Sequence, residues 1–332
     1  MREPAFWWRE AGFSSLALSP LSAVYGAIAA GRMVQDGARA GVPVICVGNF
    51  TLGGSGKTPA AIAIARLLAD AGQKPALLSR GYGGQNAGPI QVDPQLHHAS
   101  EVGDEALLLA HAAPTFVSRD RVAGAKAAVA AGASVIVMDD GLQNPSLAKA
   151  IAISVVDGRR GIGNAQVFPA GPLRAPLSVQ WEQTGALLLI GEGRAGAGLA
   201  SKAAGLGLPV FRGRLEPDPA AVTALSGRNV LAFAGIGDPE KFFATLKAAG
   251  IRAPLLRAFA DHHRYSDEEA AALLMQAEQQ ELDLLTTEKD FARIKGVPGL
   301  AALASRARVL PVSLAVAEPA TLRDFLLAKT RR

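Results

Sequence analysis

A glycine-rich segment ending in a lysine and a threonine directly follows an apolar run, and these residue types can bind phosphate. The segment, residues 48–59, reads GNFTLGGSGKTP, and the run is Val42–Val47. Glycines let backbone amides turn inward around a polyphosphate. Lys57 can reach the β- and γ-phosphates, Thr58 can ligate Mg²⁺, and Pro59 suits the first turn of a helix whose positive end faces the phosphates. The residues expected to bind the nucleotide are Thr51, Leu52, Gly53, Gly54, Ser55, Gly56, Lys57 and Thr58.

The loop departs in one position from the usual pattern G-x-x-x-x-G-K-[ST], because Thr51 stands where the first glycine is expected. The alternative is a glycine-rich turn with a surface lysine. The order strand, loop, helix favours phosphate binding, since the mechanism requires that order.

Two adjacent carboxylates, Asp139 and Asp140, follow a second apolar run, residues 134–138. In phosphate-loop enzymes an aspartate at the carboxyl end of a strand holds Mg²⁺, directly or through water. Neighbouring residues on a strand face opposite ways, so both can serve one site only if the strand has ended by Asp140. The alternative is a turn-forming Asp-Asp-Gly. We predict Thr58, Asp139 and Asp140 as the magnesium ligands.

Two further groups of polar residues could move a proton. In Asp261-His262-His263, a histidine can act as a proton shuttle near neutral pH, and an adjacent carboxylate can raise its basicity. The triplet alone fits a polar surface loop equally well, and it does not define a role for His263. Asp104 precedes a segment with helical spacing, so its residue type and position predict a helix N-cap.

Composition and charge narrow the class of protein. The chain has 332 residues, 49% hydrophobic and 19% charged, which is typical of a folded protein long enough for two domains. Its net charge of +5 suits an anionic partner, but the chain has no basic run interleaved with aromatics, so nucleic acid is disfavoured. The single cysteine, Cys46, excludes a disulfide within the chain and indicates a reducing compartment.

The N-terminus combines aromatic residues with a long uncharged segment. Trp7 and Trp8 precede residues 11–31, which carry no charge and place apolar residues at helical spacing. The segment has the length of a membrane-spanning helix, but serines dilute its apolarity and Pro20 should kink it. We predict an amphipathic helix within residues 1–35 that lies in a membrane interface, anchored by the tryptophans and flanking arginines. The alternatives are a core-packing helix and, less favoured, a signal peptide.

Strands and helices alternate along most of the chain. The expected strands are 42–47, 75–79, 115–118, 134–138, 151–156 and 186–190, with helices at 59–71, 105–112 and 121–131. The alternation indicates an α/β fold, a P-loop NTPase-like parallel sheet with helices on both faces. Residues 85–100 show no clear element.

The pattern of residue types changes around residues 210–220. We predict that this segment is a linker to a second, smaller α/β domain. A strand at 309–315 should return beside it and give a β-ribbon-like linker. The predicted division is 1–35 for the N-terminal helix, 36–212 for the P-loop domain, 213–316 for the smaller domain and 317–332 for a C-terminal helix.

Taken as a set, the motifs resemble one family, the tetraacyldisaccharide 4'-kinases of lipid A biosynthesis. The resemblance covers nearly the whole chain, and Thr51 is typical of the family. Each motif is modest alone, but their order and spacing together are highly specific. The motifs are Phe6–Arg9, Val44–Asn49, Gly53–Pro59, Ser79–Gly83, Val102–Glu105, Asp139–Gly141, Pro169–Arg174, Phe233–Gly237, Asp261–His263 and Thr286–Asp290.

The resemblance implies transfer of the ATP γ-phosphate to the 4'-hydroxyl of a tetraacylated glucosamine disaccharide 1-phosphate, forming lipid IV-A. It implies ATP and Mg²⁺ as cofactors, a lipid-linked disaccharide and a membrane surface as partners, and a peripheral location at the cytoplasmic face of the bacterial inner membrane. No protein partner is inferred. The family's catalytic aspartate matches Asp104, which would pair with His262 of the second domain and could still cap its helix. The catalytic residues expected are Asp104, His262, Lys57 and Asp261.

Two positions depart from the family pattern. Asn144 stands where the family usually has histidine, and Ala175 where it usually has glutamate. The family role of that glutamate therefore cannot be assigned to the residue at position 175.

Two other functions remain open. One is a P-loop NTPase that drives assembly or metal delivery without phosphorylating a small molecule. The other is a non-enzymatic, nucleotide-dependent membrane adaptor.

Overall fold

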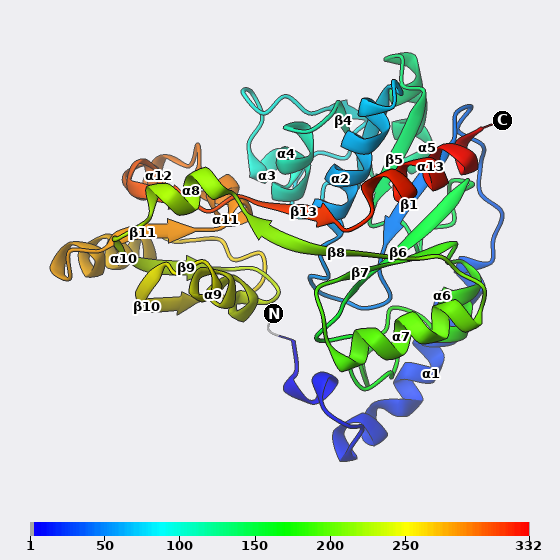
Figure 1. The fold of residues 1–332 in the computed structure, drawn as a ribbon, viewed down its shortest axis with the longest axis horizontal. Coiled ribbons are helices and arrows are strands. Elements are labelled where there is room, and N and C mark those ends of the chain that lie inside the picture. The colour runs from blue at the N-terminus through cyan, green and yellow to red at the C-terminus, as the bar shows by residue number, and fades with distance from the viewer. Residues whose placement is uncertain (1–2, 332) are drawn as a thin grey trace.

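Two β-sheets, each with its own hydrophobic cores, organise the chain in this computed structural model, which describes residues 3–331 (Figure 1). The larger sheet has nine strands in the order β13-β8-β7-β6-β1-β5-β2-β4-β3. Neighbouring strands from β8 to β4 are parallel, and β3 and β13 pair antiparallel at the two edges. The strands are β1 (Val44–Gly48), β2 (Pro75–Ser79), β3 (Ile90–Gln91), β4 (Thr115–Val117), β5 (Val135–Asp139), β6 (Ile151–Asp157), β7 (Ala186–Ile190), β8 (Val210–Pro217) and β13 (Val312–Val316).

Helices cover both faces of this sheet, as predicted. In β1, Val44 and Cys46 belong to one core and Ile45 and Val47 to the other, because successive side chains point to opposite faces. The first core also receives side chains from α5 (Arg121–Ala130), α6 (Leu177–Glu182) and α7 (Arg194–Gly205). The second receives them from α2 (Lys57–Asp70), α4 (Asp104–Ala110) and α13 (Pro319–Thr330).

The smaller sheet has four parallel strands in the order β10-β9-β11-β12. Its strands are β9 (Asn229–Ala234), β10 (Arg252–Ala258), β11 (Asp283–Thr286) and β12 (Ala307–Val309). Its helices are α8 (Pro219–Ala224), α9 (Pro239–Ala248), α10 (Asp267–Gln279), α11 (Glu288–Ile294) and α12 (Ala301–Arg306). Cores lie on both faces of this sheet as well.

The predicted ribbon between the sheets is present. β8 leads out of the larger sheet and β13 returns beside it, with Leu215 opposite Leu314 (Figure 1). Residues of β8 up to Gly213 pair with β7, and those from Gly213 onward pair with β13. The strand therefore runs across the expected boundary at residue 212, and the domain limits stay a prediction. Residues 85–100 are not wholly irregular, since β3 and the start of α3 (Ala99–Val102) lie there.

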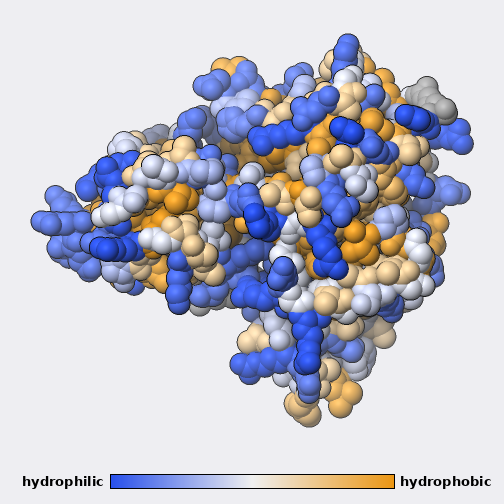
Figure 2. All heavy atoms as spheres, viewed as in Figure 1, coloured by the Kyte–Doolittle hydropathy of each residue, from blue (hydrophilic) through white to orange (hydrophobic). Residues whose placement is uncertain are grey.

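The N-terminal helix α1 (Phe13–Met33) continues through Pro20 without a break. The small residues Ser15, Ser22 and Gly26 are buried against the protein: the Ser22 hydroxyl donates to the Val167 carbonyl at 2.6 Å, and Gly26 packs on Pro176. Large apolar side chains of α1 are exposed, among them Phe13, Leu16 and Leu21. The helix lies at the lower end of the molecule in Figure 1, where Figure 2 shows hydrophobic residues at the surface. By length and composition α1 is apolar enough to cross a membrane. The expectation that its serines make it too polar was wrong.

Candidate active site

The predicted nucleotide-binding residues form one loop at the carboxyl end of β1, leading into α2. Gly53 and Gly56 have φ values of 89° and 91°, a region that favours glycine. The Lys57 ammonium donates to the Gly53 carbonyl at 3.4 Å and lies 3.8 Å from Asp140 Oδ1. Thr51 makes a β-bridge with Leu173, which explains why an extended residue suits the first position of the motif. Lys57 and Thr58 are buried in the first turn of α2.

Both carboxylates after β5 can serve this site. The strand ends at Asp139, and Asp140 has a φ of 53°, so the condition set by strand geometry is met. Asp140 Oδ1 accepts a hydrogen bond from Arg174 at 2.8 Å, whereas the buried Asp139 Oδ1 has no hydrogen-bond partner among residues 3–331. Mg²⁺ takes oxygen ligands, and this unpaired oxygen together with the Thr58 hydroxyl suits it.

The environments of the two carboxyls drive their pKa values apart. Burial, and then the charges of Glu105 and Asp140, raises the pKa of Asp139 to about 7. Burial alone also raises the pKa of Asp140, but Lys57 and Arg174 outweigh it and hold that pKa at about 2. Asp140 is therefore the more readily ionised of the pair.

Asp104 lies at the first position of α4, not at its N-cap. Gly103 takes the cap position with a φ of 89°, and a Cβ there would lie 2.5 Å from the Tyr82 carbonyl oxygen. The N-cap prediction is therefore wrong by one residue. The buried Asp104 accepts a hydrogen bond at Oδ1 from the Glu105 amide at 2.9 Å.

The structure brings Asp104 and His262 together from the two domains. His262 Nδ1 lies 3.4 Å from Asp104 Oδ2. Burial alone lowers the pKa of His262, but Asp104 and then Asp261 outweigh it and raise that pKa. Burial alone raises the pKa of Asp104, but His262, Arg293 and Lys289 together hold it well below its usual range. Both groups are therefore stabilised in their charged forms.

Asp261 lies between His262 and the phosphate loop. Its Oδ1 accepts from the His262 amide at 3.0 Å. A Cβ built on Gly237 would lie 3.4 Å from Asp261 Oδ2 and 3.1 Å from the Gly54 nitrogen, so these groups are close neighbours. His263 instead lies 2.8 Å from Glu269 and stacks on Phe259. It packs within the smaller domain, away from Asp104.

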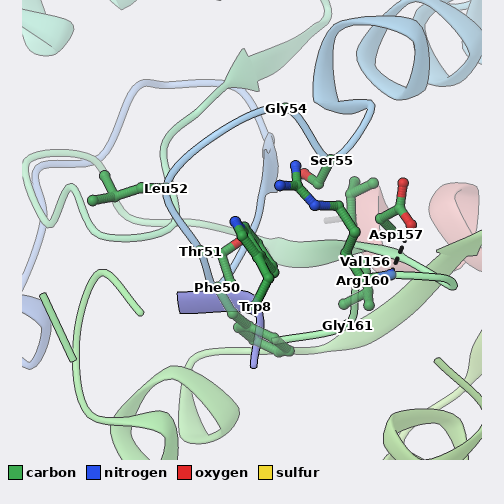
Figure 3. A pocket seen from close by; sticks show the side chains of 11 residues that line it. Trp8, Phe50, Thr51, Leu52, Gly54, Ser55, Val156, Asp157, Arg160 and Gly161 are labelled. Carbon is green, nitrogen blue, oxygen red and sulfur yellow. Dashed lines mark hydrogen bonds between the residues drawn. The ribbon is translucent and has the colours of Figure 1, made fainter. Parts of the chain in front are cut away.

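The N-terminal segment also reaches the loop, which the sequence did not suggest. Glu3 Oε2 accepts from Trp8 at 2.9 Å and from Arg160 at 2.7 Å, and a Cβ on Gly53 would lie 1.9 Å from Glu3 Oε1. Figure 3 shows Trp8 and Arg160 beside the loop. Trp7 is buried and donates to the Pro169 carbonyl at 3.0 Å. The tryptophans attach this segment to the protein, so the expectation that they anchor it in a membrane was wrong.

The two positions that depart from the family pattern have local roles. The Ala175 side chain is buried, and its carbonyl accepts from Gln180 at 2.8 Å. The Asn144 side chain accepts from the Ser146 amide at 2.9 Å. Arg174, next to Ala175, holds Asp140, so the segment still contributes a charged group to the site.

Ion pairs hold the two domains together around the site. Lys241 of α9 lies 2.6 Å from Asp157 at the end of β6, and Lys289 of α11 lies 2.5 Å from Glu105. The Asp157 side chain is 7% exposed. In each case a half-buried cation from the smaller domain pairs with a carboxylate of the larger one.

Lys241→Met is expected to lower the free energy of unfolding at pH 7 by about 1–3 kcal/mol, because it leaves a buried carboxylate without its cation. Burial alone raises the pKa of Asp157, but Lys241 and the amides of Arg160 and Arg159 outweigh it and lower the pKa. The stabilisation is thus present above the unfolded-state pKa of about 3.9 and lost as the pH falls through the folded-state value. Urea unfolding of the variant and the parent at pH 7 and pH 3 measures this loss in the free energy of unfolding.

Arg214→Met is the matched control, because it removes an exposed pair with Glu216 and should change stability by less than about 1 kcal/mol. A loss for Lys241→Met that is the same at pH 3 and pH 7 would contradict the assignment to an ion pair.

Comparison with known proteins identifies the family. A sequence model described as tetraacyldisaccharide-1-P 4'-kinase (LpxK) matches residues 14–331. The chain belongs to the tetraacyldisaccharide-1-P 4'-kinase family. A tetraacyldisaccharide 4'-kinase of Methylobacterium sp. (strain 4-46) is 56% identical over 334 residues, covering 100% of this chain and 98% of that protein. One from Bradyrhizobium sp. (strain BTAi1) is 54% identical over 326 residues, covering 98% and 94%.

A solved structure in the same family has a similar fold. The crystal structure of LpxK from Aquifex aeolicus in complex with ATP has a TM-score of 0.73 and is 26% identical, covering 96% of this chain and 99% of its own. The resemblance to the kinase family and the α/β fold class are thereby confirmed. The roles of individual residues in this member of the kinase family stay predictions.

Proposed function

We propose that this kinase transfers the γ-phosphate of ATP to the 4'-hydroxyl of a tetraacylated glucosamine disaccharide 1-phosphate, giving lipid IV-A. The observation that supports the proposal is that Gly237 lies beside both Gly54 of the phosphate loop and Asp261, the neighbour of His262. The cross-domain pair Asp104–His262 is thus close to the loop, in a chain of this family. The alternative function, a P-loop NTPase that phosphorylates no small molecule, gives the Asp104–His262 pair no role.

Each residue of the site has a separate role in this proposal. Backbone amides of Gly53–Gly56 hold the phosphates, and Lys57 neutralises charge on the phosphoryl group as it moves. Thr58, Asp139 and Asp140 would hold Mg²⁺, which supplies further charge neutralisation when bound. Catalysis of this kind is mainly positioning and electrostatics, because the transition state is loose.

Asp104 accepts the proton of the sugar hydroxyl in this proposal. Its low pKa makes it a weak base at rest, so the proton transfers only as bond formation to phosphorus makes the hydroxyl acidic. His262 orients Asp104 or relays the proton, and Asp261 lies beside His262. Closure of the two domains around the substrates would exclude water from the site.

Label transfer tests the proposal against its rivals. With γ-labelled ATP and the disaccharide acceptor, the kinase should move label into a glycolipid that is extracted by organic solvent. Label released as inorganic phosphate without lipid would favour the NTPase, and unconsumed ATP would favour the adaptor. Either result would contradict the proposed function.

We further propose that α1 rests on the cytoplasmic face of the inner membrane, where ATP is available and a lipid acceptor can be reached. Its outward residues include Phe13, Leu16, Leu21 and Ile28, each more than half exposed. Apolar side chains on one side of a helix bind the boundary between headgroups and acyl chains. The buried Ser15 and Ser22 hold the opposite side to the kinase domain.

Replacing Leu16, Leu21 and Ile28 together with serine should weaken binding to phospholipid vesicles at least about tenfold, since burying each such side chain contributes about 1.5–3 kcal/mol. Vesicle co-sedimentation measures it. Met275→Ser, at a 53% exposed position on α10, is the control and should bind like the parent. Unchanged sedimentation of the triple variant would exclude this face of α1 as the contact.

A further inference from the structure

Helix α11 of the smaller domain presents two cations to the first turn of α4. Lys289 and Arg293 are four residues apart and so lie on one face of the helix. Lys289 pairs with Glu105 at 2.5 Å, and Arg293 Nε donates to Asp104 Oδ2 at 2.6 Å. Each of two adjacent acidic residues therefore receives a cation from the opposite domain.

Arg293 is itself fixed by the smaller domain. Its Nη1 donates to the Gly235 carbonyl at 2.7 Å and to Asp290 Oδ1 at 2.9 Å. The fully buried Asp290 also accepts from the hydroxyls of Tyr265 at 3.0 Å and Thr287 at 2.6 Å. One edge of the guanidinium is thus held within this network, and the Nε edge faces Asp104. The Arg293 side chain is 8% exposed, so these contacts are largely shielded from bulk water.

The contacts on Asp104 divide between its two oxygens. Oδ1 accepts from the Glu105 amide of its own helix, while Oδ2 faces Arg293 and His262. The carboxylate is therefore oriented by one group from the larger domain and two from the smaller. We propose that Arg293 is a positioning residue for phosphoryl transfer, which fixes the Asp104 carboxylate against His262 when the two domains are together.

The inference rests on the proposed role of Asp104 and adds a consequence for pH dependence. The charged groups near Asp104 are Arg293, His262, Lys289 and its neighbour Glu105, with Asp261 beyond His262. Burial alone would raise the pKa of Asp104, and these cations oppose it. Removing the Arg293 charge should therefore raise that pKa and move the acid limb of the kcat profile to higher pH.

Arg293→Met and Arg293→Lys test the proposal through kcat and KM measured from pH 9 down to the lowest pH at which each enzyme stays folded, because the acid limb set by Asp104 lies below pH 5 in the parent. Arg293→Met should lower kcat about 10–100-fold, leave KM for MgATP within a few-fold and shift the acid limb upward. Arg293→Lys keeps the charge but loses the planar fork, so it should lower kcat while the acid limb stays near that of the parent. Arg308→Met removes an exposed cation from the same domain and should match the parent in both readouts.

A double variant separates positioning from general stability. In an Asp104→Asn background, Arg293→Met should cause no further loss of kcat, because its effect passes through Asp104. Should Arg293→Met fail to fold, Arg293→Lys carries the same comparison. The inference would be overturned if Arg293→Met lowered kcat as much in the Asp104→Asn background as in the parent. It would also be overturned if the single Arg293 variants kept the kcat and acid limb of the parent. Either result would leave the proposed role of Asp104 standing. Parent-like activity of Asp104→Asn would overturn both the inference and the proposed base.

Discussion

Asp104→Asn is expected to lower kcat about 10²–10⁴-fold and to leave KM for MgATP within a few-fold. The side chain keeps its shape but loses the negatively charged carboxylate that we propose accepts the proton of the sugar hydroxyl. Asp104 contacts groups from the smaller domain and is not part of the phosphate loop, so nucleotide binding should persist. Steady-state kinetics at saturating acceptor measure both constants.

The control for this variant is Asp324→Asn, which changes an exposed aspartate on α13 that pairs with its neighbour Arg323. It should leave both constants unchanged. The substitution removes the anionic partner of Arg293 and His262, so folding of Asp104→Asn is checked by circular dichroism. A folded Asp104→Asn enzyme with kcat within a few-fold of the parent would remove Asp104 from the mechanism.

Lys57→Met has the second large expected effect, a fall in kcat of about 10²–10³-fold. The buried Lys57 ammonium lies on the loop carbonyl of Gly53 and near Asp140, where we propose that the transferred phosphoryl group binds. Burial lowers the pKa of Lys57, with Asp140 opposing. Methionine fills similar space without a charge, so the loss reports charge neutralisation and not packing.

Lys126→Met, on the exposed side of α5, is the control for lost charge and should be as active as the parent. Single-turnover measurement separates the chemical step from nucleotide binding for Lys57→Met. If the chemical step kept the parental rate and only nucleotide affinity fell, Lys57 would be a binding residue alone.

Features that depend on neighbouring residues in the chain could be predicted from the sequence. The phosphate loop, the buried strands and the Asp139–Asp140 pair all follow from local order, because a strand, a turn and a helix must be consecutive to place those groups. The contact of Asp104 with His262 was predicted only through the family resemblance. No spacing rule connects residues that lie on different domains.

The parts that the sequence could not predict depend on distant packing. Arg293 contacts Asp104, which lies 189 residues earlier in the chain. Glu3, near the N-terminus, contacts the phosphate loop at Gly53. Nothing in the order of residues near Arg293 distinguishes it from a surface cation at the end of a short helix. Similarly, the serines of α1 diluted its apolarity in the sequence, but in the structure Ser15 and Ser22 face the protein and leave the outer side apolar.

The position of the new phosphate on the product tests the central claim most directly. Phosphorus–proton correlation NMR of the purified glycolipid product should show a second phosphate monoester coupled to the proton at carbon 4' of the distal glucosamine. A phosphate on a different hydroxyl, or a glycolipid with only its original 1-phosphate after the ATP has been consumed, would contradict a 4'-kinase mechanism built on Asp104 and Lys57.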